Sequence, residues 1–184
     1  EIHGVDELTG EWYDALDCEQ LLWVHAALEV ATNDFYELTV AEMNTAEKDQ
    51  YHEENKLASD LLLLPADFLP RTYADMEAYV SDMIGSGRLV LSDVAIEVAE
   101  LITKSMVPLR IKPIWKFVAF AAVGTLDPRL RELYGITWTG SQQRWLDVNL
   151  SMIKTMRPLA PTKFRWILPA RWAHMRLDHP PLVA

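Results

Sequence analysis

A chain of 184 residues, half of them hydrophobic, has enough apolar material for one globular domain with a sizeable core. Its single cysteine, Cys18, excludes an intramolecular disulfide and any metal site built from several cysteines. The net charge of −10 argues against nucleic acid as a partner, and no apolar run approaches the roughly 20 residues that span a bilayer.

The charge is unevenly distributed along the chain. Residues 1–60 carry 16 acidic and two basic side chains, whereas residues 110–184 carry four acidic and 12 basic ones. Two interpretations are open: the two parts attract each other within one fold, or the basic part faces an anionic partner.

The first two predicted helices begin at clear capping residues. Asp17 is a suitable N-cap for a helix that runs to about Leu38. Asn44, with Glu47 three residues later, has the pattern of a capping box and starts the next helix, which ends before Pro65. Both helices are therefore expected from local sequence alone.

Helical signals continue along the rest of the chain. The expected helix starts are Thr72 with Asp75, Ser92, Pro113, Asp127 before Pro128, Ser141, and Thr162 for a last helix that a proline interrupts. Residues 88–91 are the only strand-like run, and there is no hairpin signal or internal repeat. The predicted fold class is all-α, with about seven helices in a single domain.

The first helix carries a polar group on a largely apolar surface. At 100° per residue, Leu21, His25 and Leu28 share one broad face, and Trp23 lies opposite. Such a helix should be central and packed on both sides, with His25 largely buried. His25 is then either a core histidine satisfied by Glu29 or a backbone carbonyl, or a pocket residue beside a cofactor.

Common catalytic motifs are absent. A ferritin-type di-iron site needs Glu-x-x-His pairs, and the chain has none. His52 and Glu53 begin a zinc-protease pattern, but Lys56 stands where the second histidine belongs. The chain has no Gly-x-Ser-x-Gly motif and no glycine-rich phosphate loop.

A series of weaker motifs nevertheless occurs in a distinctive order. They are His-Gly-Val at 3–5, then YDALD, LLWVHAAL, YHEE, LPRTYADMEAYVSDM, RELYGITW and RWILPARWA. This series resembles the mpaB / latex-clearing-protein family, the catalytic domain of rubber oxygenases, over nearly the whole chain.

The resemblance implies a helical fold with a globin-like core that binds haem b and uses dioxygen on a hydrophobic, isoprenoid-like substrate. His3 occupies the position of the family's proximal haem histidine and is the implied metal ligand. His25 and Tyr36 are implied to be cofactor-pocket groups, and no catalytic acid or base can be named. Residues 3–8 read as a helix end and a turn, which would direct His3 and His25 toward a common cavity.

The chain also departs from the family pattern. Members of the family carry a helical region with an Arg and Thr motif before the haem histidine. Residues 1–184 do not contain this helical region. Residues 1–184 are therefore expected to be the C-terminal portion of one helical oxygenase-like domain. A further N-terminal segment or a partner chain is expected to complete the fold.

An alternative function is a non-catalytic interaction or membrane-peripheral protein on the same scaffold. Residues 163–177 alternate tryptophans with arginines, a mixture that suits contact with an anionic membrane surface. Pro169 interrupts this segment, and the competing interpretation is a final helix packed on the acidic part of the chain. A cytoplasmic or membrane-peripheral location is favoured.

Overall fold

Helices make up most of the structure, a computed structural model that describes the chain except residues 1–2, 6–9, 11, 104–107, 111 and 162–184. The elements are β1 (His3–Val5), β2 (Trp12–Asp14), α1 (Cys18–Thr39), α2 (Thr45–Leu61), α3 (Tyr73–Gly85), α4 (Asp93–Thr103), α5 (Lys112–Thr125), α6 (Pro128–Leu133) and α7 (Gly140–Met156). Short 3₁₀ turns lie at Ala66–Phe68 and Arg157–Leu159. The all-α class is confirmed.

The predicted helix starts are largely confirmed by their caps. The Asp17 side chain accepts hydrogen bonds from the backbone N–H groups of Glu19 and Gln20 at the start of α1. Capping boxes open α2 at Asn44 and α3 at Thr72, as expected.

Helix α7 begins within one residue of its expected start at about Ser141. Thr139 and Gln142 form a third capping box there, so the helix begins at Gly140 rather than Ser141. The Thr-x-x-Gln spacing was present in the sequence and marks this start. The helix expected from Thr162 lies outside the described residues.

A short hairpin at the beginning of the chain was not predicted. Strands β1 and β2 pair antiparallel, with His3 opposite Asp14 and Val5 opposite Trp12. The expectation of a helix end at His3 is therefore wrong, and residues 88–91 form no strand. Three-residue strands are too short to show a period of two, and their stability comes from pairing across the hairpin.

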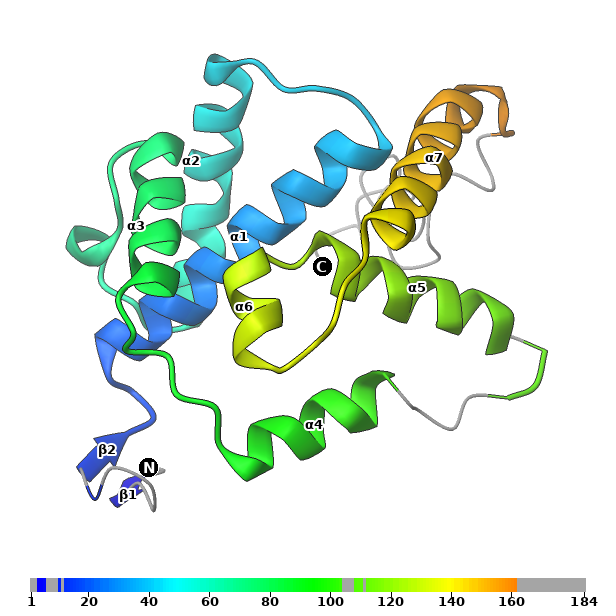
Figure 1. The fold of residues 1–184 in the computed structure, drawn as a ribbon. Helices are drawn as coiled ribbons and strands as arrows, with labels where there is room; N and C mark the ends of the chain where they lie inside the picture. The colour runs from blue at the N-terminus through cyan, green and yellow to red at the C-terminus, as the bar shows by residue number, and fades with distance from the viewer. Residues whose placement is uncertain (1–2, 6–9, 11, 104–107, 111, 162–184) are drawn as a thin grey trace, which may run out of the picture.

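Helix α1 is central, as expected, and packs against α2 and α3 on one side and α7 on the other (Figure 1). The main core joins Leu22 and Ala26 of α1 to Met76 of α3 and to two leucines that follow α2, Leu64 and Leu69. This arrangement buries one face of α1 against the pair α2 and α3.

The expected apolar face of α1 is only partly the buried one. Leu28 is 63% exposed, because the helix turns His25, Ala26 and Glu29 inward instead. Hydrophobic periodicity predicted that Leu28 and His25 would be buried together. In the structure, the buried face of the helix includes polar residues such as Glu29 and leaves Leu28 in solvent.

A second, smaller core lies between α5 and α7. Ala121, Leu146 and Leu150 are buried there, with Trp138 packed against them. Gly124 allows the close approach, because a Cβ at this position would lie 2.3 Å from Cδ2 of Leu146.

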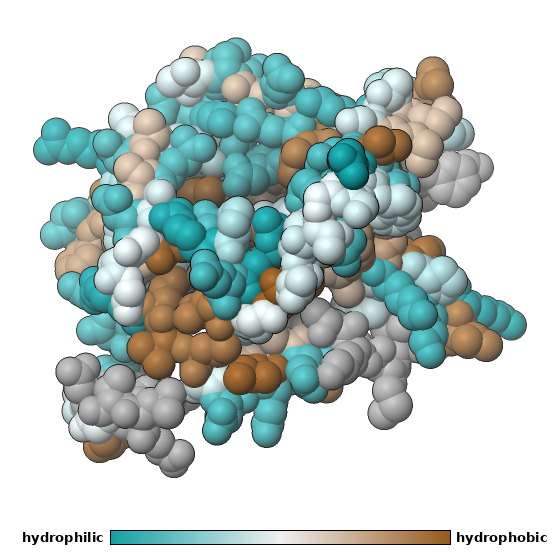
Figure 2. All heavy atoms as spheres, viewed as in Figure 1, coloured by the Kyte–Doolittle hydropathy of each residue, from teal (hydrophilic) through white to brown (hydrophobic). Residues whose placement is uncertain are grey.

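Several helices leave apolar side chains in contact with solvent. Figure 2 shows hydrophobic side chains gathered at the lower left of the molecule, near the segment between α3 and α4. On α4 itself, Val94, Val98 and Leu101 are exposed. The described residues alone therefore leave part of the apolar surface uncovered.

Candidate functional site

A line of buried polar side chains runs along α1. His25, Glu29 and Asn33 follow one another at intervals of four residues, so they lie on one face of the helix. All three are almost completely buried, with His25 only 4% exposed. The prediction that His25 is largely buried is confirmed, and polar groups at such depth require partners.

His52 of α2 supplies the strongest partner. Its Nδ1 lies 2.7 Å from Oε1 of Glu29, and its Nε2 lies 3.0 Å from the carbonyl oxygen of Pro70. Because a carbonyl can only accept, Nε2 carries a proton, and the short contact at Nδ1 requires a second proton between His52 and Glu29. The pair is therefore an imidazolium with a carboxylate, or a neutral imidazole with a carboxylic acid, and has no net charge in either form.

His25 faces the other oxygen of the same carboxyl group. Its Nε2 lies 3.3 Å from Oε2 of Glu29, although the orientation of the two groups does not meet hydrogen-bond geometry. Glu29 thus lies between two imidazole rings, one from its own helix and one from α2. The interpretation of His25 as a core histidine beside Glu29 agrees with this geometry.

Sequence reasoning missed the role of His52, which it considered only as part of an incomplete zinc motif. The sequence of α2 carries no clear signal for this role, because His52 lies in the middle of a helix rich in charged residues. Its partner Glu29 is 23 residues away, and only the packing of α1 on α2 brings them together.

The line continues toward Asn33 and Tyr73. The phenol of Tyr73 is buried, and its burial, together with the nearby carboxylates of Asp34 and Glu77, raises the pKa of this tyrosine well above its usual range. The side chain of Asn33 interacts with the Tyr73 hydroxyl and acts to lower this pKa, but less strongly than burial raises it. Tyr73 therefore remains a neutral donor and acceptor at physiological pH.

His3, the ligand implied by the family resemblance, lies elsewhere. It is exposed on β1, and its ring centroid is 5.9 Å from that of Trp12 on the paired strand. Val5 and Trp12 are exposed beside it. An accessible imidazole next to apolar side chains has the donor chemistry that haem iron accepts, so these residues fit such a group.

The structure does not bring His3 and His25 together in any described contact. Neither residue lines any of the four cavities described for this chain. Their common cavity therefore remains a prediction. Tyr36, the third implied pocket group, lines a cavity between α1 and α2.

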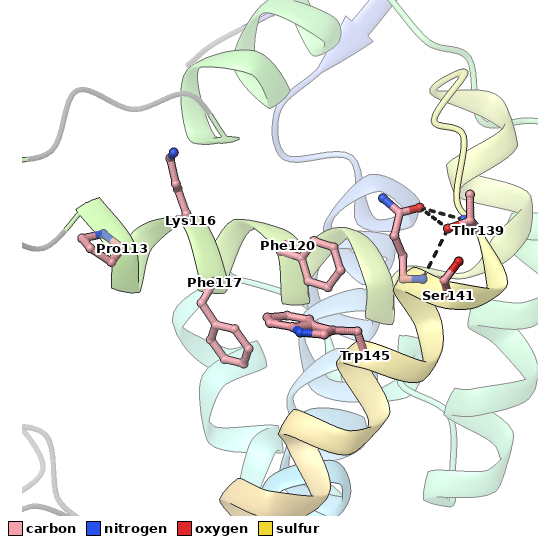
Figure 3. Close-up of a pocket in the computed structure, with 8 residues that line it drawn as sticks. Pro113, Lys116, Phe117, Phe120, Thr139, Ser141 and Trp145 are labelled. Atoms are coloured by element: carbon pink, nitrogen blue, oxygen red, sulfur yellow. Dashed lines mark hydrogen bonds between the residues drawn. The ribbon is translucent and has the colours of Figure 1, made fainter.

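A largely apolar cavity of about 500 Å³ lies between α5 and the start of α7. Figure 3 shows the rings of Phe117, Phe120 and Trp145 close to one another in this space. The Phe120 and Trp145 rings meet edge to face, with centroids 5.0 Å apart. The cavity has the size and lining of a site for a small hydrophobic molecule.

The described part of the chain shows neither a clustered metal site nor a membrane-spanning helix. Within it, no group of three or more His, Cys, Asp or Glu side chains is arranged to hold a metal ion. None of its helices is both long and apolar enough to cross a membrane. The segment 163–177, for which membrane contact was expected, lies outside the described residues.

Comparison with known proteins identifies the family. Residues 1–157 match the model of the family described as "ER-bound oxygenase mpaB/B'/Rubber oxygenase, catalytic domain". No curated protein and no solved structure matches the chain. The match covers most of the chain and includes β1, the buried histidines and the apolar cavity, so this chain belongs to the mpaB/B' and rubber oxygenase catalytic-domain family.

Proposed function

We propose that this chain is part of a haem-dependent oxygenase that acts on a hydrophobic, isoprenoid-like substrate. The observation that carries the proposal is the match of residues 1–157 to a family of oxygenase catalytic domains. The dependence on haem and the class of substrate are inferences from that family, and individual residues support them.

His3 would hold the cofactor through a nitrogen of its exposed imidazole. The neighbouring Val5 and Trp12 offer apolar surface to a flat hydrophobic ring system. Haem b, when bound, would supply an iron atom that binds dioxygen for the oxidation of the substrate.

The buried centre of His25, Glu29 and His52 would act as support for this site rather than as a source of iron ligands. His25 is enclosed and faces Glu29, whereas His52 uses both ring nitrogens within the fold. These contacts hold α1 against α2 and fix the helix that follows the hairpin carrying His3. Tyr36, further along α1, remains a proposed pocket group.

The apolar cavity lined by Phe117, Phe120 and Trp145 is the best candidate among the described cavities for binding a hydrophobic substrate. Its aromatic walls would exclude water and contact an alkyl or alkenyl chain without demanding a specific polar group.

We also propose that a further segment or a partner chain covers part of this surface, with these residues forming the C-terminal portion of the domain. The exposed Val94, Val98 and Leu101 on one helix support this idea, because an isolated surface rarely keeps so many apolar side chains together.

A comparison of two histidine variants tests the proposal. The full-length protein is purified with haem as wild type, His3→Ala and His25→Ala, and absorption spectra are recorded with circular dichroism as the folding control. Loss of the His3 imidazole should abolish or strongly shift the haem spectrum, whereas His25→Ala should keep haem while losing stability or activity. An unchanged haem spectrum in a folded His3→Ala variant would show that another residue holds the iron.

A further inference from the structure

The aromatic cavity between α5 and α7 has one charged side chain in its lining, that of Lys116. Pro113, Lys116, Phe117 and Phe120 line the cavity from α5, at the spacing that places residues on one face of a helix. Lys116 is exposed and makes no ion pair or hydrogen bond with another described residue. In Figure 3, its side chain extends away from the rings of Phe117 and Trp145. An unpaired ammonium group therefore lies at the edge of an apolar site.

The lining contains no carboxyl group to neutralise this charge. None of the eight described residues that line the cavity is Asp or Glu, although the chain has 27 acidic residues. Each of the other three described cavities has at least one acidic side chain in its lining, such as Asp34, Glu132 or Glu42. Among the described cavities, this one is therefore the site whose charge favours an anion.

The other polar side chains of the lining carry no charge. Thr139, Ser141 and Gln142 come from the start of α7, and the Oε1 atom of Gln142 accepts hydrogen bonds from the backbone N–H and the hydroxyl group of Thr139. Figure 3 shows Thr139 and Ser141 with an aromatic ring, that of Phe120, between them and Lys116. The charged end of a ligand would therefore lie at Lys116, and its apolar part would lie among the rings.

We propose that this cavity binds a single-chain amphipathic anion, an isoprenoid-like chain that ends in a carboxylate. This inference rests on the proposed role of the cavity as the site for a hydrophobic substrate, and it adds the charge at one end of that substrate. The chain would contact the rings of Phe117, Phe120 and Trp145, and the carboxylate would pair with the ammonium group of Lys116. Because an exposed ion pair adds little affinity, Lys116 would act mainly on selectivity.

Calorimetric titration of the full-length protein with citronellate and with citronellol tests the proposal. The two molecules share one carbon skeleton, but citronellate ends in a carboxylate and citronellol in a neutral hydroxyl group. Citronellate should bind about three- to fivefold more tightly, and high salt should remove this preference by screening the charge. Equal affinity at low salt would overturn the assignment of an anion and leave the apolar site standing. Binding of neither molecule would overturn the role of the cavity as well.

A pair of lysine variants locates the charged end of the ligand. Lys116→Gln should make the two affinities equal and leave citronellol binding unchanged, because only the charge is removed. Lys112→Gln is the matched control, since Lys112 is exposed one turn earlier on α5 and does not line the cavity. It should keep the preference for citronellate. A preference that survived in Lys116→Gln, or that was lost equally in Lys112→Gln, would place the carboxylate elsewhere.

A tryptophan variant tests the position of the apolar chain separately. Trp145 is 52% exposed, so Trp145→Ala removes a wall of the cavity without opening a fully buried core, and circular dichroism checks the fold. The variant should weaken citronellate and citronellol by the same factor, about tenfold, because the ring contacts only the shared chain. Unchanged binding of both molecules in folded Trp145→Ala would show that the chain does not lie in this cavity.

Discussion

Removal of the His52 side chain is the sharpest test of the buried polar centre. His52→Ala deletes a ring that is 1% exposed, together with its contacts of 2.7 Å to Glu29 and 3.0 Å to the Pro70 carbonyl. The Glu29 carboxyl group then keeps only His25 beside it, at 3.3 Å and in poor orientation. Breaking a buried pair in this way typically costs about 3–5 kcal/mol.

Urea unfolding followed by tryptophan fluorescence measures this loss, with Glu53→Ala as the control on the same helix. Glu53 is exposed and its ion pair with Lys56 is on the surface, so the control should change the free energy of unfolding by less than about 0.5 kcal/mol. If His52→Ala changed the free energy of unfolding by less than about 1 kcal/mol, the buried pair would not stabilise the fold as described.

The coupling between the two residues provides a second check. In Glu29→Gln/His52→Ala, no carboxyl group is left buried without its partner. The loss should therefore be smaller than the sum of the two single losses by at least about 1 kcal/mol. If the loss in the free energy of unfolding of the double variant equalled the sum of the two single losses, the side chains of Glu29 and His52 would not interact in solution.

Two further predictions concern stability. Gly124→Ala should cost about 1–3 kcal/mol in the same urea assay, because the added Cβ would lie 2.3 Å from Cδ2 of Leu146; an unchanged midpoint would refute the close helix contact. The backbone N–H of Met43 and then the ammonium group of Lys48 hold the pKa of Glu37 below its ordinary value of 4.5. Because its folded pKa is the lower one, Glu37 stabilises the protein fully above pH 4.5 and this contribution is lost as pH falls through the folded pKa. Glu37→Gln should therefore flatten the acid side of the stability profile, and an unchanged slope there would contradict the contact.

Helix starts were predictable because their signals are local. Asp17, Asn44 and Thr72 each bond to backbone groups within three residues, so their roles can be inferred without the fold. The pairing of β1 with β2 was missed because strands of three residues, such as those that pair Val5 with Trp12, show no periodicity.

The site was only partly predictable for a related reason. The burial of His25 followed from an apolar helix, and Glu29 four residues later was the expected partner. His52 comes from a different helix, and the carbonyl of Pro70 from a loop beyond it, so no sequence spacing could reveal their meeting. The prediction that Leu28 is buried was wrong. Hydrophobic periodicity shows which residues share a helix face, but it does not show how far neighbouring helices cover that face.

The absorption spectrum of the full-length wild-type protein, purified after expression with a haem supply, tests the central claim most directly. A haem-dependent oxygenase with His3 as ligand should show a Soret band that follows the protein through gel filtration, at about one haem per chain. A folded protein with no Soret band would contradict the haem proposal, although the chain would remain a member of the oxygenase family.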